Sequence, residues 1–139
     1  MTRPSTRALI FRVLMLIYIF AVMYLCFAHF NNLPDAPRTI FGIQTDKIAH
    51  FIMFFPFPIL GFYAYDRLTK TPLQAFAAVI TIFSTGGVFA GITEIVQGAM
   101  PYRTQDIHDF HADLLALGIA AVIVFVIDVA KMKPSGKRK

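Results

Sequence analysis

The chain has 139 residues, of which 57% are hydrophobic, 14% aromatic and 15% charged, with a formal net charge of +5 and a mean hydropathy of +0.63. A soluble domain of this size buries only about 70% of the surface of its unfolded chain. This composition therefore excludes a water-soluble globular protein and favours one that lipid covers. The single cysteine excludes an internal disulfide.

The first apolar segment covers residues 8–30 and follows the basic residues Arg3 and Arg7. It is longer than the core of a usual secretory signal, and no pair of small residues marks a cleavage site after it. We therefore expect a retained transmembrane helix. Cys26 lies inside this apolar run, which favours a buried structural thiol over a reactive one.

Three further apolar segments follow at residues 48–65, 73–98 and 110–129, each close to the roughly 20 residues that cross a bilayer as a helix. Pro56 and Pro58 each remove a backbone donor, and they predict a kink in the second segment.

The third segment contains Gly86, Gly87 and Gly91, which predict close helix packing in lipid. The connections on either side of this segment are short, so neighbouring helices should be antiparallel. The sequence thus predicts an all-α fold, an integral membrane four-helix bundle of antiparallel hairpins that forms one domain over residues 1–139.

The basic residues predict the orientation of this bundle. Ten of the 13 lie on the side that holds both termini: Arg3, Arg7, Arg12, Arg67, Lys70, Lys131, Lys133, Lys137, Arg138 and Lys139. We therefore expect a multi-pass protein of the cell membrane with N and C termini in the cytoplasm. The basic tail 131–139 is expected to be attracted to anionic lipid, and nucleic acid is not expected as a partner.

Polar residues gather at the opposite, outer ends of the last three segments, where an ionisable group is costly unless it is paired or hydrated. Helical spacing places them on shared faces, in groups three or four residues apart. They are Asp46, Lys47 and His50, then Glu94 and Gln97, and finally Asp106, Asp109 and Asp113. Arg103, in the loop before the last segment, offers a planar fork that suits a carboxylate or phosphate.

This pattern resembles the VanZ-like family of small membrane proteins. The resemblance lies in Asp46-Lys47-x-x-His50-Phe51 with Leu60-Gly61, and in Glu94-x-x-Gln97-x-x-x-Pro101-x-Arg103 followed by Asp109 and Asp113. It extends over nearly the whole chain. It implies a four-helix membrane protein whose relatives contribute to resistance against teicoplanin-type glycopeptides, and it implies no particular reaction.

Four interpretations of the polar residues stay open. They can form an interhelical network that only fixes the helix packing. They can bind, and modify, a lipid-linked or cell-wall component, with Asp46, Lys47, Gln97, Arg103 and Asp113 as binding residues and His50, Glu94 and Asp109 as acid–base groups.

The third interpretation is a metal site that draws on His50, Glu94, His108, Asp109, His111 and Asp113. The fourth is a proton-coupled carrier or a pore, which is disfavoured because the acids cluster at one face and only Thr81, Ser84 and Thr85 are polar near the middle of the third segment. We adopt the lipid-binding interpretation, with membrane lipids as partners. The sequence assigns no metal, no cofactor and no oligomeric state.

Overall fold

The computed structural model describes residues 5–28, 39–65, 69–103 and 105–132. Several basic residues used to predict the orientation, namely Arg3, Arg38, Arg67 and the tail residues 133–139, lie outside the described residues.

The described residues form five helices: α1 (Thr6–Phe27), α2 (Thr45–Phe54), α3 (Pro56–Ala64), α4 (Pro72–Gly98) and α5 (Ile107–Lys131). Because α2 and α3 are consecutive, they make one helical path, Thr45–Ala64. This path and the other three helices are each long and apolar enough to cross a membrane. The prediction of four apolar helical segments is thereby confirmed.

Two of the helices, α1 and α5, begin two or three residues before the apolar segments, and a polar residue caps each of them. The Ser5 side chain accepts a hydrogen bond from the amide of Ala8 at 3.2 Å, which starts α1. The Asp106 side chain accepts one from the amide of His108 at 2.9 Å, which starts α5. Capping residues satisfy the free amides of a first turn, but hydropathy does not detect them. The end of the first predicted segment, residues 29–30, lies outside the described residues.

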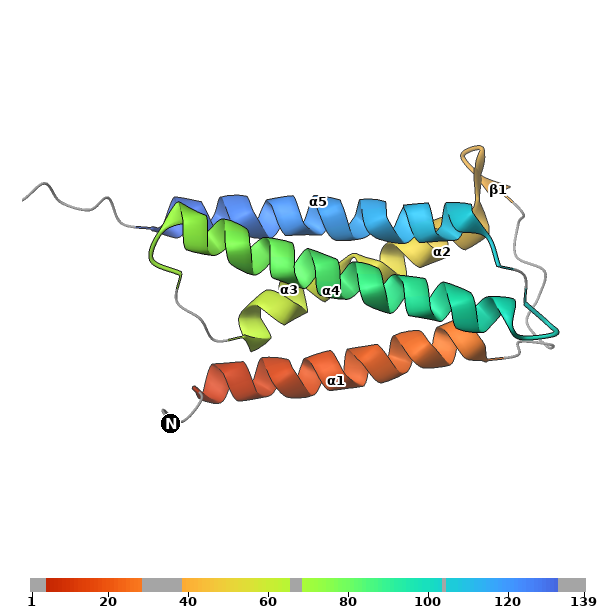
Figure 1. Cartoon of the computed structure of the whole chain (residues 1–139), viewed down its shortest axis with the longest axis horizontal. Helices are drawn as coiled ribbons and strands as arrows, with labels where there is room; N and C mark the ends of the chain where they lie inside the picture. Colours follow the sequence, from red (N-terminus) through yellow and green to blue (C-terminus); the bar gives the residue numbers. More distant parts are fainter. Residues whose placement is uncertain (1–4, 29–38, 66–68, 104, 133–139) are drawn as a thin grey trace, which may run out of the picture.

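The helical path of α2 and α3 is interrupted at Phe55, immediately before Pro56 and three residues before Pro58. This confirms the predicted kink and follows from the amide hydrogen that each proline lacks. The interruption redirects the chain, because α2 packs mainly against α5 whereas α3 also packs against α1 (Figure 1).

A small β-hairpin precedes α2, an addition to the predicted all-α fold. Strand β1 (Thr39–Ile40) pairs antiparallel with β2 (Ile43–Gln44). The two turn residues have positive φ angles, 53° at Phe41 and 80° at Gly42. Positive angles at both positions are typical of the two-residue turn whose twist matches that of the flanking strands. Phe41 is 99% exposed at the tip.

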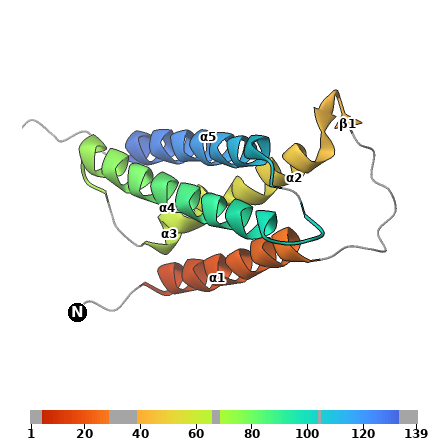
Figure 2. The same ribbon diagram turned by 45° about the vertical axis from the view of Figure 1, so that its right-hand side comes forward.

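The helices run antiparallel along a common direction, and α1 begins at the same end at which α5 ends (Figures 1 and 2). We call this the terminal end. At the opposite end α4 finishes, α2 and α5 begin, and the hairpin lies (Figure 1). We call this the cluster end, since it carries most of the polar residues discussed below.

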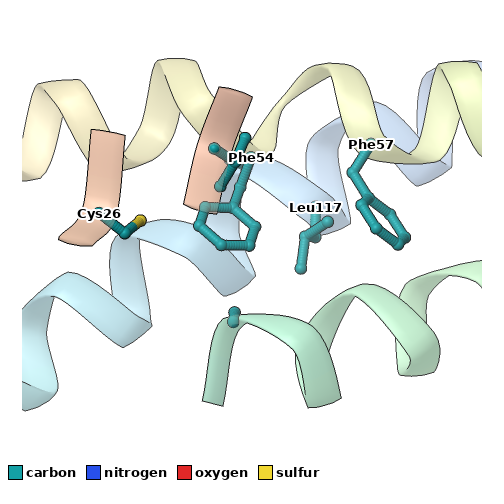
Figure 3. Close-up of a cluster of buried hydrophobic side chains, with 7 residues drawn as sticks. Cys26, Phe54, Phe57 and Leu117 are labelled. Carbon is teal, nitrogen blue, oxygen red and sulfur yellow. The ribbon is translucent and has the colours of Figure 1, made fainter. Parts of the chain in front are cut away.

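An apolar core lies between the helices (Figure 3). Its buried members come from all four helical segments: Val22, Cys26, Phe54, Phe57, Ala90, Ala116 and Leu117. Gly86 is needed for this packing, because a Cβ atom there would lie 2.7 Å from Leu117 Cδ2 and 3.0 Å from Phe57 Cδ1. A Cβ on Gly91 would meet only an ordinary contact at 3.7 Å. A Cβ on Gly87 would lie 3.3 Å from Leu114 Cδ2, so the predicted role of the glycines rests on Gly86 and, to a lesser degree, on Gly87.

Large apolar side chains also cover the outside of the helices. Phe20 in α1 is 68% exposed, Ile95 in α4 is 68% exposed and Val122 in α5 is 62% exposed. A soluble protein does not expose apolar surface on this scale, whereas lipid tails solvate it.

Candidate functional site

His50, Glu94 and Asp113 meet at the cluster end, and each comes from a different helix. His50 Nδ1 lies 3.1 Å from Asp113 Oδ1 and 3.8 Å from Glu94 Oε1. The exposed fractions are 3% for His50, 4% for Glu94 and 0% for Asp113. We call these three residues the inner triad.

The inner triad contains buried carboxylate oxygens that accept no hydrogen bond from a described residue. Neither Oε1 nor Oε2 of Glu94 accepts a hydrogen bond from a described residue, and neither does Oδ2 of Asp113. Buried polar atoms in native proteins nearly always have a partner, and an unpaired buried carboxylate is far more costly than a neutral group. The inner triad is therefore not a self-satisfied network.

Lys47 bridges two aspartates beside the triad. Its Nζ lies 2.8 Å from Asp106 Oδ2 and 3.3 Å from Asp109 Oδ1, which ties the start of α2 to the start of α5. The Lys47 and Asp106 side chains are 22% and 35% exposed, whereas the Asp109 side chain is 5% exposed. The hydrogen bond from Lys47, together with that from the His108 amide, holds the pKa of Asp106 below its ordinary value. Lys47, Asp106 and Asp109 form the rim of the site.

Helical spacing explains why these residues meet. Lys47 and His50 are three residues apart on α2, and Asp106, Asp109 and Asp113 follow at three and four residues along the start of α5. Since α2 and α5 pack side by side, one face of α2 meets one face of α5. Asp46, on the first turn of α2, is exposed and lies close enough to His50 and Asp109 to share a ligand with them.

Gln97 and Arg103 were expected to bind a ligand, but their side chains donate hydrogen bonds to backbone carbonyls of α1. Gln97 Nε2 donates to the carbonyl of Cys26 at 3.1 Å. Arg103 Nη2 donates to the carbonyls of Leu25 and Ala28 at 3.1 and 3.4 Å.

Tyr102 completes this group by donating its hydroxyl to the carbonyl of Phe27 at 3.2 Å. The last carbonyls of a helix have no partner within that helix, and a cation is favourable beside them. We call Gln97, Tyr102 and Arg103 the α1 clasp, because they hold the C-terminal end of α1 against the end of α4.

The eight residues expected at the site thus separate into groups. His50, Glu94 and Asp113 form the inner triad, Lys47 and Asp109 belong to the rim, Asp46 lies beside it, and Gln97 and Arg103 bind α1. The sequence reasoning did not assign a role to Asp106 or Tyr102. The position of Asp106 as a possible helix cap before α5 was the sequence signal that could have identified it. No sequence signal pointed to Tyr102.

His108 and His111 lie outside these groups. Both are exposed on α5, and their rings form an edge-to-face pair with centroids 6.0 Å apart. The described His, Cys, Asp and Glu side chains that converge closely enough for a metal include neither of them. They are Asp46, His50 and Asp109 in one group and His50, Glu94 and Asp113 in the other.

Two cavities lie towards the terminal end, away from the inner triad. One of about 410 Å³ is lined by Phe62, Tyr65 and Gln74 among others. The other, of about 360 Å³, is lined by Arg7, Asp128 and Lys131 among others. The Asp128 carboxylate there accepts a hydrogen bond from Thr69. The first cavity is lined by apolar and neutral polar residues, and only the second has charged residues in its lining. Neither lining contains a convergent acid–base set like the inner triad.

The arrangement at the cluster end has the parts of an acid–base or cation-binding site. An imidazole lies between two buried carboxylates, and an ammonium group stands at the accessible rim. Such groups can move a proton or hold a cation, and the rim lysine can attract an anion.

Comparison with known proteins gives one relative and no family assignment. The chain is 31% identical over 106 residues to an uncharacterized protein of the fission yeast Schizosaccharomyces pombe, a match that covers 76% of this chain and 59% of the relative. The chain thus spans about three fifths of the length of the relative that it matches. No family model matches the chain, and no solved structure matches it.

Proposed function

We propose that the chain is a four-helix-bundle protein of the cell membrane with both termini in the cytoplasm, so that the inner triad and its rim lie at the outer face. The orientation rests on the ten basic residues predicted on the side of the termini. The arrangement of the helices supports it, since α1 begins and α5 ends at one end (Figure 1).

The proposed role is to bind, and to modify, a lipid-linked or cell-wall component at that face. The observation that carries this proposal is Glu94, a buried carboxylate beside His50 and Asp113 that has no hydrogen-bond partner among the described residues. A group held at such a cost is typical of functional sites rather than of structural ones.

Each polar residue has a role in this proposal. Lys47, at the exposed rim, attracts the phosphate or carboxylate of the component. His50 gives or takes a proton, Asp113 orients its ring through the 3.1 Å contact, and Glu94 acts as the base. The lipid tail lies along the exposed apolar faces of the helices.

The α1 clasp has a positioning role. Because Gln97 and Arg103 are bonded to carbonyls of α1, we assign them the task of holding α1 beside the inner triad rather than of contacting the component.

Membership of the VanZ-like family, and with it an influence on sensitivity to teicoplanin-type glycopeptides, completes the proposal. It is supported by the spacing of Asp46, Lys47, His50, Glu94 and Arg103 and by the four apolar helical segments.

Susceptibility measurements test this function. A glycopeptide-sensitive host that produces the wild-type protein should tolerate more teicoplanin than one that produces the Glu94→Gln or His50→Ala variant at the same membrane level. Equal susceptibility with and without the wild-type protein would rule out the antibiotic role.

A structural network is the alternative, and Lys47 is the observation in its favour. A lysine that bridges Asp106 and Asp109 joins α2 to α5 without any ligand. If the network were the whole function, substitutions in the inner triad would lower stability, and the phenotype would fall only in proportion. The carrier alternative is weaker, because the ionisable residues of the site gather at one end of the helices and only Thr81, Ser84 and Thr85 are polar near the middle of the third segment.

A further inference from the structure

The inner triad has the composition of a metal-binding site. His50, Glu94 and Asp113 each offer one ligand atom, and these atoms all lie within 4.8 Å of one another. Imidazole nitrogen and carboxylate oxygen are ligands that zinc and other divalent transition metals accept. The three residues come from α2, α4 and α5, so their convergence depends on the packing of three helices.

The distances suit a tetrahedral ion. Two ligands of a zinc ion, each at about 2.0–2.2 Å from the metal, lie about 3.3–3.6 Å apart. His50 Nδ1 is 3.1 Å from Asp113 Oδ1 and 3.8 Å from Glu94 Oε1, and these two values bracket that separation. The two carboxylate oxygens lie within 4.8 Å of each other, so small side-chain movements would bring the three atoms into coordination geometry.

The unpartnered oxygens supply an independent argument. Both oxygens of Glu94 and Oδ2 of Asp113 are buried and accept no hydrogen bond from described residues. A divalent cation would give the Glu94 carboxylate the partner that it lacks, and its charge would balance the two carboxylates. A protonated His50 carries one charge only and leaves the pair unbalanced.

The second group of convergent ligands, Asp46, His50 and Asp109, is less suited to a cation. Asp46 is exposed, and Asp109 is already paired with the ammonium group of Lys47 at 3.3 Å. A cation there would compete with that lysine. Since both groups need His50, the inner triad is the better site.

We infer that His50, Glu94 and Asp113 bind a divalent transition-metal ion, with zinc as the ion that their nitrogen and oxygen ligands fit. Three protein ligands leave a position for water or for a substrate oxygen, as in catalytic zinc sites. This inference does not depend on the lipid proposal, because the ion would bind in the absence of any lipid component.

Metal analysis of the purified protein tests the inference. The full chain, carrying an affinity tag without histidine, is purified in detergent, loaded with zinc chloride and freed of unbound metal. Elemental analysis should then find about one zinc per wild-type chain. The Glu94→Gln and Asp113→Asn variants should each lose most of this zinc while they remain monodisperse. X-ray absorption at the zinc edge should show nitrogen and oxygen neighbours and no sulfur from Cys26.

Two control variants sharpen the result. Asp128→Asn makes the same chemical change at the other end of α5 and should keep the zinc. Asp109→Asn should also keep it, and loss of zinc in that variant would move the site to the other group and overturn the inner triad as the ligand set. No zinc in the wild-type protein, or full zinc in both triad variants, would overturn the inference whatever the susceptibility measurements give.

Discussion

His50 Nδ1 lies 3.1 Å from the Asp113 carboxylate across the interface of α2 and α5, and the two residues are 63 positions apart in the chain. Both residues are buried, with 4% of the His50 side chain and 0% of the Asp113 side chain exposed. The contact therefore couples the packing of two helices to the chemistry of the site.

A double-mutant cycle measures this coupling. We expect His50→Ala and Asp113→Ala to show a coupling free energy of about 1–2 kcal/mol in unfolding. Each single substitution breaks the same buried hydrogen bond to a charged group, so the double variant loses that bond only once. Reversible unfolding in mixed micelles provides the measurement. The cycle of His50→Ala with Asp128→Ala, at the opposite end of α5, should give no coupling. Equal values from the two cycles would show that the 3.1 Å contact contributes nothing specific.

Substitution of Lys47 should destabilise the protein more than substitution of Asp106. Lys47→Met leaves the buried Asp109 carboxylate without its partner, which should cost about 1–3 kcal/mol of unfolding free energy. Asp106→Asn removes only the exposed half of the bridge and keeps a residue that can cap α5, so its cost should be smaller. Denaturant titration of both variants ranks the two costs, and the opposite order would mean that the Asp109 pair is unimportant.

The bridge to Asp106 should depend on pH. Its pKa in the folded protein lies below the ordinary 3.8, chiefly because of the hydrogen bond from Lys47. The stability that this carboxylate contributes is therefore present above 3.8 and is lost as the pH falls through the folded pKa. The difference in unfolding free energy between the wild-type protein and Asp106→Asn should shrink over that acidic range, and a difference that grows instead would contradict the ion pair.

The α1 clasp predicts the accessibility of Cys26. This residue is the only cysteine of the chain and is 1% exposed, next to the carbonyls that the clasp holds. Arg103→Ala should speed its reaction with a maleimide in detergent, because the end of α1 is released. Arg12 lies near the other end of α1 and donates to the carbonyl of Ala64 in α3. Arg12→Ala removes that contact and should leave the rate of the Cys26 reaction unchanged. Equal rates in all three proteins would show that the clasp does not hold α1.

Gly86 and Gly91 form a matched pair for helix packing. Gly86→Ala places a Cβ atom between Leu117 and Phe57 and should lower the unfolding free energy by about 1–3 kcal/mol. Gly91→Ala meets only an ordinary contact with Phe110 and should be neutral or slightly stabilising, since alanine favours a helix. Thermal unfolding of the two variants distinguishes them, and equal stability would mean that α4 has room at Gly86.

Much of the fold could be predicted because hydropathy and proline placement act locally. The four apolar segments and the interruption before Pro56 follow directly from residue type. The early helix starts at Thr6 and Ile107 depend on side-chain caps at Ser5 and Asp106, which an average over an apolar window does not detect. The hairpin around Gly42 is too short to produce a recognisable alternation.

The candidate site was only partly predictable for a similar reason. Spacing along a helix identifies which residues share a face, so Asp46 with His50 and Asp109 with Asp113 could be grouped. The sequence cannot show what lies opposite a face. For this reason Arg103 was expected near the carboxylates, whereas it donates to backbone carbonyls of α1.

The central claim is that the inner triad binds a ligand and does not merely hold helices together. Native mass spectrometry of the gently solubilised wild-type protein beside Glu94→Gln tests it most directly. We expect the wild-type chain to carry an additional mass, a lipid component or a metal ion, that Glu94→Gln lacks although it remains folded. Identical masses for the two proteins, with a lower unfolding temperature for Glu94→Gln, would contradict the claim and identify the cluster as a structural network.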